Sequence, residues 1–378
     1  MRNFKSALTF ALCVSANVVA ERLYIPPVYH NDSIEVEGLS VAGNLDGPKM
    51  RTAANCTSFD FWYFDAFSTS TQRLQSILSS AIQVTPRRNP NPLAVQVSGT
   101  FDKGTQFSGQ VFASKGVVID SGEDGISASW DGSGASFRGT SLEKPNPEYS
   151  IKFDSPSISV TGNVRLQADA DAIDFHCSAQ PPHYPCNPNV EGLNTLLLPH
   201  LHWANAVPDA VATVNLKING TNFRIDNGVD YHDKNWVDTS VITSPKYWDL
   251  GQARLRPYSV VWYDLLDYGN NEHAYAYVTR DGKLVSVSCA ANAVRVRQSG
   301  PNATYPPTGG IPEATGLTAR FDLGEGQIFA LNLTKDAIVH DETVYARALG
   351  SVTGGIEKQE TYTGRAHYEE YVYGLLFA

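Results

Sequence analysis

The sequence predicts an all-β protein with few helices, arranged as two β-barrel or sandwich domains. Short segments that alternate apolar and polar residues recur along most of the chain, as half-buried antiparallel strands do. Turns rich in Gly, Asn and Asp separate them at the spacing typical of sandwiches and barrels. The chain has 378 residues, more than one hydrophobic core usually spans, so two domains are expected.

The expected strands are residues 93–101, 106–113, 126–130, 135–140, 158–167, 211–218, 258–263, 273–279, 283–288, 317–323, 328–333 and 344–349. Residues 74–84 fit the spacing of a helix and also that of a strand, so the sequence leaves that segment open. The triplet Asp226-Asn227-Gly228 is typical of a turn, and we place the domain boundary there. The N-terminal β domain then covers residues 21–225 and the C-terminal β domain residues 226–378.

The first twenty residues have the layout of a signal peptide. Arg2 and Lys5 precede an apolar stretch of about a dozen residues, and small residues end it at Ala20. That stretch is too short to span a bilayer stably, and no later segment is long and apolar enough, so no membrane span is expected. We therefore expect residues 1–20 to direct the protein into the secretory pathway, where it is secreted or kept in a vesicle or vacuole lumen.

Five Asn-x-Ser/Thr triplets agree with that compartment. They predict N-glycosylation at Asn31, Asn55, Asn219, Asn302 and Asn332.

Four cysteines follow the signal segment, namely Cys56, Cys177, Cys186 and Cys289. An even number in an oxidising compartment is typical of disulfides, for which three connectivities exist. We expect Cys177 to pair with Cys186, because these two residues flank a short Pro-rich loop, and Cys56 to pair with Cys289. Four buried thiols are the alternative, and zinc is not expected because the chain has no Cys-x-x-Cys pair.

Charge and motifs exclude several classes of partner. The formal net charge is −10 and no basic run exceeds Arg87-Arg88, which disfavours a nucleic-acid partner. The chain has no P-loop, no dinucleotide-binding glycine motif, no zinc-protease motif and no hydrolase elbow, so no cofactor and no metal are expected. The spacing of His200 and His202 suits a metal site, but it suits buried or cavity-lining histidines equally well. Nothing in the sequence predicts an oligomeric state.

Two blocks stand out as candidate functional segments. In residues 227–236, alternation along a strand puts Tyr231, Asp233 and Asn235 on one face and His232, Lys234 and Trp236 on the other. A junction between domains, with its polar groups paired to each other, is the structural alternative. In residues 59–65 the same alternation groups Phe59, Phe61, Tyr63 and Asp65 against Asp60, Trp62 and Phe64. Core packing is the common meaning of such a run, but a carboxylate among aromatic rings needs a partner or a raised pKa.

Together the two blocks resemble known families. The stretch Trp62-Tyr63-Phe64-Asp65 is similar to the W-Y-F-D stretch of fungal lipocalin-like Diels–Alderases. Residues 231–236, followed by Tyr247-Trp248 and residues 258–263, resemble the Y-x-D-H-N-W-G block of the related carotenoid 1,2-hydratases. The chain departs from that block at Lys234, where His is usual, and at Val237, where Gly is usual.

The resemblance implies two lipocalin-like β domains, with a hydrophobic pocket between or within them, that close polyene-bearing natural products without a cofactor. The signal peptide and glycosylation sites make the chain most similar in character to secreted hetero-Diels–Alderases of tropolonic sesquiterpenoid pathways. The implied function in fungal secondary metabolism is a stereoselective addition of a tropolone quinone methide to a humulene-type terpene. Its partners would be small hydrophobic substrates, a polyene or terpenoid and a reactive diene, held in near-attack geometry.

The resemblance also assigns site residues. Asp233 is the expected general acid, with His232 and Tyr231 as alternative acids or hydrogen-bond donors. The expected substrate-binding residues are Trp62, Tyr63, Asp65, Trp203, His202, Asn235, Trp236 and Trp248. Three other functions stay open on sequence alone: a secreted lipocalin-like carrier of a terpenoid or pigment, an isoprenoid hydratase or dehydratase, and a carbohydrate-binding protein.

Overall fold

The computed structural model describes residues 20–40, 45–70, 72–83, 91–169, 193–290, 292–301, 303–307, 314–342 and 344–376. Regular structure in these ranges is almost entirely β. The helical pieces described are the short 3-10 turns η2 (Pro156–Ile158), η3 (Val241–Thr243) and η5 (Tyr373–Leu376). The expected all-β class with few helices is therefore confirmed.

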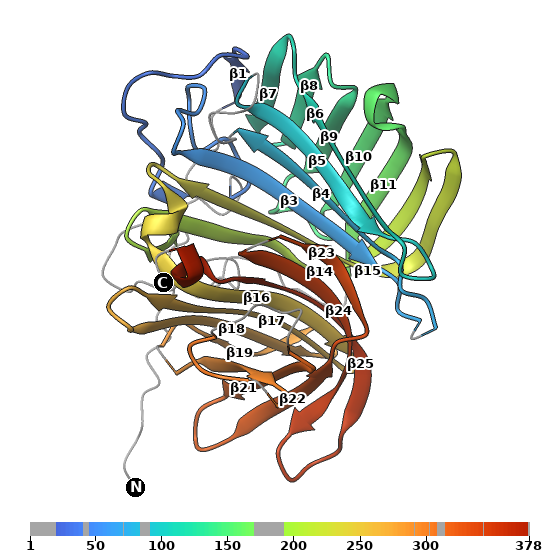
Figure 1. The fold of residues 1–378 in the computed structure, drawn as a ribbon, viewed down its shortest axis with the longest axis vertical. Coiled ribbons are helices and arrows are strands. Elements are labelled where there is room, and N and C mark those ends of the chain that lie inside the picture. The colour runs from blue at the N-terminus through green and yellow to red at the C-terminus, as the bar shows by residue number, and fades with distance from the viewer. Residues whose placement is uncertain are drawn as a thin grey trace, which may run out of the picture.

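The first sheet has thirteen strands and forms the upper half of the molecule in Figure 1. Its order is β1 (Glu21–Ile25), β7 (Gly116–Gly122), β8 (Gly125–Asp131), β9 (Ala135–Thr140), β10 (Glu148–Ser155), β11 (Val160–Ala168), β14 (Leu201–Ile218), β15 (Thr221–Val237), β3 (Phe59–Phe67), β4 (Ser76–Gln83), β5 (Leu93–Thr100) and β6 (Gln106–Phe112), with β13 (Leu196–Leu198) beside β14. A separate small pair joins β2 (Leu39–Ser40) and β12 (Leu193–Asn194). Because β5 contacts β8 and β6 contacts η2, the sheet curls over its own inner face.

The second sheet has ten strands and forms the lower, gold-to-red half (Figure 1). Its order is β19 (Lys283–Ser288), β18 (Glu272–Arg280), β17 (Tyr258–Asp267), β16 (Pro245–Leu255), β25 (Tyr362–Tyr371), β24 (Tyr345–Ile356), β22 (Ile328–Thr334), β21 (Gly316–Asp322) and β20 (Val294–Ser299), with β23 (Ala337–Asp341) beside β24. Contacts from β20 to β17 and β18 curl this sheet as well. Two curled sheets match the expected pair of lipocalin-like domains.

All the expected strand segments overlap observed strands, and the ambiguous segment at residues 74–84 contains the strand β4. The expected turn at Asp226-Asn227-Gly228 is not formed, because the strand β15 continues through these residues. Gly228 pairs with Ala212 and Asp226 with Thr213, so Asn227 is an extra residue, a β-bulge with φ of 53°. The chain leaves the first sheet only after Val237 and enters the second at Pro245, so we place the change of sheet there rather than at residues 225–226.

Three large apolar clusters among the described residues explain this arrangement. One fills the inside of the first sheet around Trp62 and Trp130, and one fills the second around Trp262 and Phe321. The third lies between the sheets and takes residues from both, Trp203 among them. The strands at the junction, β3, β15, β16 and β25, are consequently buried on both faces.

Polar contacts also tie the two sheets together. Arg254 on β16 donates through Nη2 to the carboxylate of Asp209 on β14 and to the backbone oxygen of Ala210, the latter at 2.7 Å. Nearer the rim, Gln106 donates to the backbone oxygen of Ile338 at 2.8 Å.

The cysteine pairing requires a correction. Cys56 is a free thiol, so the expected Cys56–Cys289 bridge is wrong. Cys56 lies in the loop before β3 in the first sheet, whereas Cys289 follows the edge strand β19 of the second and is disulfide-bonded elsewhere. The expected Cys177–Cys186 bridge lies outside the described residues. Counting cysteines gives the possible pairings but not the distances that decide between them.

The expected glycosylation sites differ in exposure. Asn31, Asn219 and Asn332 are exposed, and Asn219 occupies the tight β14–β15 turn with φ of 50°. Asn55 is half-buried, and its side-chain oxygen accepts hydrogen bonds from Thr57 and Ser58. Asn302 and the expected signal segment, apart from Ala20, lie outside the described residues. Among the helices described, none is long and apolar enough to cross a membrane.

The Arg254–Asp209 contact gives a stability test. Replacing Arg254 in Arg254→Met leaves the carboxylate of Asp209 buried at 1% side-chain exposure without its cation. We expect the free energy of unfolding to fall by about 3–5 kcal/mol. The matched control is Arg224→Met, because Arg224 pairs with Asp226 at 70% exposure and should contribute within about 1 kcal/mol. Urea unfolding followed by tryptophan fluorescence measures both, and equal losses would contradict the assigned role of the contact.

Candidate active site

An enclosed cavity of about 120 Å³ lies between the two sheets. Its lining comes from both halves of the chain: β3, β4, β5 and β15 on one side, and β16, β23, β24 and β25 on the other. The lining residues are Phe61, Tyr63, Leu78, Gln96, Ser98, Asn235, Trp248, His340, Tyr345, Arg347, Glu369 and Tyr371. Rings dominate one part of the wall, and several ionisable or amide groups converge from the other, which is the composition of a typical ligand site.

The expected alternation along β15 is confirmed. Tyr231, Asp233 and Asn235 face the second sheet, where the first joins the apolar cluster between the sheets and the last lines the cavity. On the neighbouring strand β3, Tyr63 is paired with Asp233 in register and also lines the cavity. The strand period of two thus brings these predicted residues to one surface.

Asp233 lies directly behind the cavity wall. Its carboxyl group accepts hydrogen bonds from Trp203 Nε1 at 2.7 Å, from the Tyr231 hydroxyl at 2.8 Å and from Asn235 Nδ2 at 3.1 Å. Burial raises the pKa of Asp233 to about 8, although the donors from Trp203 and Tyr231 act in the opposite direction. Asp233 therefore orients Asn235 and holds a proton at neutral pH, but it does not itself line the cavity.

Glu369 is the carboxyl group that does line the cavity. It is 6% exposed, and its Oε2 accepts a hydrogen bond of 2.7 Å from the Tyr345 hydroxyl. Burial raises the pKa of Glu369 to about 7, against the lowering effects of Tyr345 and Arg347. A carboxyl group with this pKa supplies substantial amounts of both acid and base near neutral pH, as general acid–base catalysis requires.

Arg347 lies two residues from Tyr345 on β24 and faces the same cavity. Its side chain is 1% exposed, and Nη2 donates to Ser98 Oγ at 2.5 Å across the junction between the sheets. A buried guanidinium of this kind remains charged, because the nearby groups Tyr345, Tyr63 and Glu369 raise its pKa further while burial opposes them.

The rings of the wall belong to an aromatic cluster in which Tyr345 and Tyr373 stack on Tyr371 and Trp248 meets it edge-on. The ring of Tyr371 lies 4.1 Å from that of Tyr345, 4.3 Å from that of Trp248 and 5.0 Å from that of Tyr373, measured between centroids. Such a surface packs against a flat substrate and attracts a positive charge that develops beside it.

Asp65, predicted because a carboxylate among rings needs a partner, has two. Gln252 Nε2 donates to Oδ1 at 2.5 Å, and His367 Nδ1 lies 2.9 Å from Oδ2. Both partners belong to the second sheet, so Asp65 joins the halves of the molecule rather than lining the cavity. Trp203 likewise packs between the sheets, edge-on to Tyr275 at 4.7 Å.

The structure turns four further expected site residues away from the cavity. Trp62, His202, His232 and Trp236 project to the opposite face of β3, β14 and β15, and none of them lines it. His232 stacks on Phe64 at 4.1 Å, and His202 stacks on Trp236 at 5.4 Å. Alternation sends these even-numbered residues into the first sheet's interior, which argues against direct substrate contact at this site.

Lys234 shares that interior face. Its Nζ pairs with Asp60 and lies 3.2 Å from the centre of the Trp62 ring, and neither ionic side chain is exposed. Burial lowers the pKa of Lys234 to about 8, although Asp60 raises it. At this position the hydratase block has His, whereas this chain has Lys234, which forms a buried ion pair with Asp60.

His200 and His202 do not form a metal pair with acidic ligands. His200 is exposed and contacts Asp238 at 2.8 Å, whereas His202 lies 3.1 Å from Thr195. Across the residues that the structure describes, no group of three or more His, Cys, Asp or Glu side chains is arranged to hold a metal ion.

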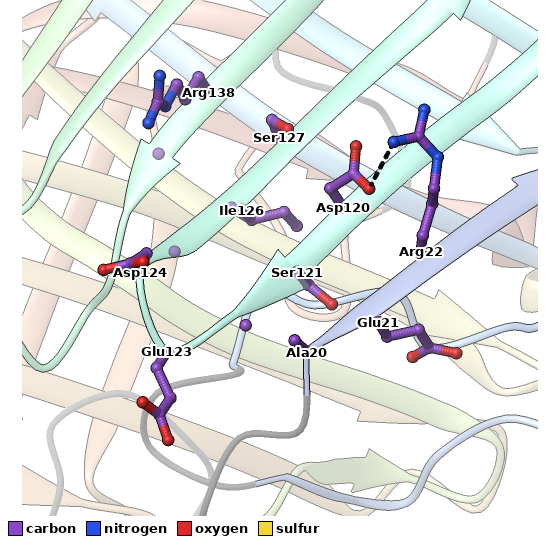
Figure 2. Close-up of a pocket in the computed structure, with 13 residues that line it drawn as sticks. Ala20, Glu21, Arg22, Asp120, Ser121, Glu123, Asp124, Ile126, Ser127 and Arg138 are labelled. Carbon is purple, nitrogen blue, oxygen red and sulfur yellow. Dashed lines mark ion pairs between the residues drawn. The ribbon is translucent and has the colours of Figure 1, made fainter.

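A more open depression lies far from this site, along β1, β7, β8 and β9 (Figure 2). Its side chains are exposed or half-buried, except that of Ile126, and they diverge, apart from the surface ion pair between Arg22 and Asp120 at 3.3 Å. Its ionisable side chains do not converge on a common point, so it offers no chemistry comparable to that of the cavity between the sheets.

Sequence reasoning missed Glu369, Arg347, Tyr345 and Tyr371. The available signal was alternation: His367, Glu369 and Tyr371 recur at every second residue near the C-terminus, as do Tyr345 and Arg347. Polar and aromatic residues at this spacing, on strands that are otherwise apolar, mark a face that is neither plain core nor solvent.

Comparison with known proteins agrees with the fold. A family model described as Diels-Alderase-like matches residues 28–298. The chain belongs to the Diels-Alderase-like family. It is 37% identical to the quinolone epoxide rearrangement protein penF of Penicillium thymicola over 358 residues, which covers 93% of this chain and 96% of that protein. It is 34% identical to the quinolone epoxide rearrangement protein asqO of Emericella nidulans over 351 residues, covering 92% of each.

More distant likenesses extend the comparison. The Diels-Alderase ucsH of an Acremonium species is 22% identical over 241 residues, which covers 60% of this chain and 54% of that protein. The crystal structure of CghA superposes with a TM-score of 0.72 at 16% identity, covering 93% of this chain and 98% of that one. At that identity the second likeness shows the fold alone. The sequence-based resemblance to Diels–Alderases is confirmed at the level of the family.

Asp233 gives a pH test. Its pKa of about 8 in the folded protein lies above the ordinary 3.8, so between those values the folded state keeps a proton that the unfolded state has lost. The contribution of this proton to the free energy of unfolding is fully present below pH 4. It is lost as the pH rises to 8, at about 1.4 kcal/mol per pH unit. Asp233→Asn removes this dependence, so its stability relative to wild type should rise from pH 5 to pH 7.

Urea unfolding at both pH values measures the effect. The exposed carboxyl of Asp154 provides the control, since Asp154→Asn should leave the wild-type pH dependence unchanged. Parallel pH profiles for wild type and Asp233→Asn would show that Asp233 is ionised in the folded protein.

Proposed function

We propose that the protein is a cofactor-free isomerase that rearranges an epoxide carried by a quinolone-type substrate. The observation that carries the proposal is Glu369, a buried carboxyl group with a pKa of about 7 in a cavity lined by aromatic rings. Two relatives more than 30% identical over most of the chain bear the name quinolone epoxide rearrangement protein. The same family also contains Diels–Alderases, whose reactions need little more than a shaped, apolar pocket.

The chemistry needs one proton and no other reagent. Glu369 donates its proton to the epoxide oxygen as a C–O bond breaks, and the electron pair of that bond goes to oxygen. A neighbouring bond then migrates to, or attacks, the electron-deficient carbon. Loss of a proton from the rearranged cation to the Glu369 carboxylate restores the acid, so substrate and product are isomers and no oxidant or reductant is consumed.

The surrounding residues suit a cationic intermediate. Trp248 and Tyr371 line the cavity with aromatic rings, whose electrons attract positive charge, and the position of the cavity between the sheets limits the access of water, which would otherwise open the epoxide to a diol. Tyr345 is hydrogen-bonded to Glu369 and fixes the direction of the acid.

The second candidate function is the addition of a tropolone quinone methide to a humulene-type terpene, which the sequence resemblance implies. It has less support, because the two relatives more than 30% identical over most of the chain bear the name quinolone epoxide rearrangement protein and not that of a Diels–Alderase. A carrier function or an isoprenoid hydratase would use the same cavity and remains an outcome of the assay below.

We also propose that the protein acts within the secretory pathway. The exposed acceptors Asn31, Asn219 and Asn332 and the disulfide at Cys289 support this compartment.

The decisive assay compares Glu369→Gln with Glu370→Gln. Adjacent residues on a strand face opposite ways, and Glu370 contacts Tyr247 and Gln298 instead of lining the cavity. We expect Glu369→Gln to lower kcat about 10²–10⁴-fold and Glu370→Gln to leave it nearly unchanged. Wild-type kcat should fall as the pH rises above 7, because the protonated form of Glu369 is lost.

The substrate is a quinolone bearing an epoxide, incubated with native protein, heat-denatured protein or buffer and resolved by chiral chromatography. Equal losses in the two variants would remove Glu369 as the acid. If the epoxide is untouched but a quinone-methide precursor and humulene give one enantiomer over many turnovers, the second candidate replaces the first. Binding without turnover of either set would indicate a carrier.

A further inference from the structure

The cavity between the sheets presents hydrogen-bonding atoms that no described residue satisfies. Nε and Nη1 of Arg347 have no partner, although the side chain is 1% exposed. Asn235 is 4% exposed, and while its Nδ2 donates to Asp233, its Oδ1 has no partner. Buried polar groups are normally paired, so unpaired atoms gathered around one cavity indicate the hydrogen bonds that its ligand makes.

These atoms define the ligand by their polarity. Arg347 can only donate, and Asn235 Oδ1 can only accept. A hydrocarbon polyene would satisfy neither residue. A carboxylate would satisfy Arg347 but would leave Oδ1 of Asn235 facing another acceptor. A ligand that fits both must carry a donor and an acceptor, and the N–H and C=O of a secondary amide in a ring supply one of each.

We propose that Arg347 and Asn235 recognise a secondary lactam, with the lactam carbonyl accepting from Arg347 and its N–H donating to Asn235 Oδ1. This inference deepens the proposed function and rests on it for the choice of substrate, since a 2-quinolone in its keto form contains such a lactam. Arg347 and Asn235 are then specificity-determining residues, distinct from the acid Glu369.

Above the pKa of Asp233, about 8, the supporting residues hold Asn235 in the required orientation. Asp233 accepts from Asn235 Nδ2, and Trp203 and Tyr231 hold Asp233 in place through its other oxygen. When Asp233 is ionised it can only accept, so the amide must keep Nδ2 toward it and Oδ1 away. Ser98 performs the corresponding task for Arg347, whose Nη2 is engaged while Nε and Nη1 stay available.

Two unreactive probes of nearly the same shape test the proposal. Quinolin-2(1H)-one carries the lactam N–H, and coumarin replaces that N–H by oxygen while it keeps the carbonyl. Binding is followed by ligand-observed NMR titration at pH 9, above the pKa of Asp233 at about 8, with circular dichroism confirming the fold. We expect the lactam to bind about tenfold more tightly than coumarin, since one hydrogen bond is lost and one buried acceptor is left unpaired.

Variants assign the preference to each side chain. Asn235→Leu removes the acceptor at similar size, so the ratio of the two affinities should fall to about one. Arg347→Lys keeps the charge but loses the planar fork, so both probes should weaken by a similar factor and the ratio should persist. Equal binding of lactam and coumarin to the wild-type protein overturns the proposal, even if a variant fails to fold.

The lactam recognition and the proposed function can be disproved separately. Neither probe contains an epoxide, so a lactam preference that depends on Asn235 upholds the recognition even if no epoxide is rearranged. If instead epoxides of the lactam and of the matching coumarin rearrange at equal kcat/KM, the proposed function stands and the lactam recognition is wrong.

Discussion

The burial of both faces of the strands at the junction is the constraint on which the rest of the structure depends. On β3, β15, β16 and β25 one face fills a curled sheet and the other fills the space between the sheets. The buried polar side chains of these strands cannot reach bulk water, so most of them are paired, and several carboxyl groups have shifted pKa values. The pKa values of Glu369 and Asp233 are raised for this reason. The carboxyl group of Asp65 is hydrogen-bonded by residues of the opposite sheet. The chemistry of the cavity is thus a consequence of how the two sheets pack.

Much of the fold follows from period-two patterning. The expected strands appear because alternation and turn residues are local signals, and the same rule separates Tyr231, Asp233 and Asn235 from His232, Lys234 and Trp236. Prediction from local pattern fails where the same short sequence is compatible with two backbone structures. Asn227-Gly228 suits both a turn and a bulge, since each requires a backbone that Asn and Gly tolerate, and the pairing partner Ala212 decides for the bulge.

The candidate site was only half accessible from the sequence. Tyr63, Asn235 and Trp248 were predicted, and they line the cavity. The blocks that carry the family resemblance lie near residues 62 and 233, on strands of the first sheet. Arg347 and Glu369 lie on β24 and β25 of the second sheet, outside those blocks. Their importance depends on distance to Tyr63 and Asn235 across the junction, a long-range quantity that no local pattern contains. The same limit explains the wrong cysteine pair, since Cys56 and Cys289 lie in different sheets.

Glu369 and Glu370 are chemically identical neighbours, yet one lines the cavity and the other contacts Gln298 on the far side of β25. Strand register alone assigns their different roles. A single inserted or deleted residue upstream in β25 would exchange the two carboxyl groups without altering the composition of the strand. Among relatives of this chain, spacing within β25 is therefore a better guide to retained activity than the mere presence of acidic residues, and alignments that place a gap there will misassign the acid.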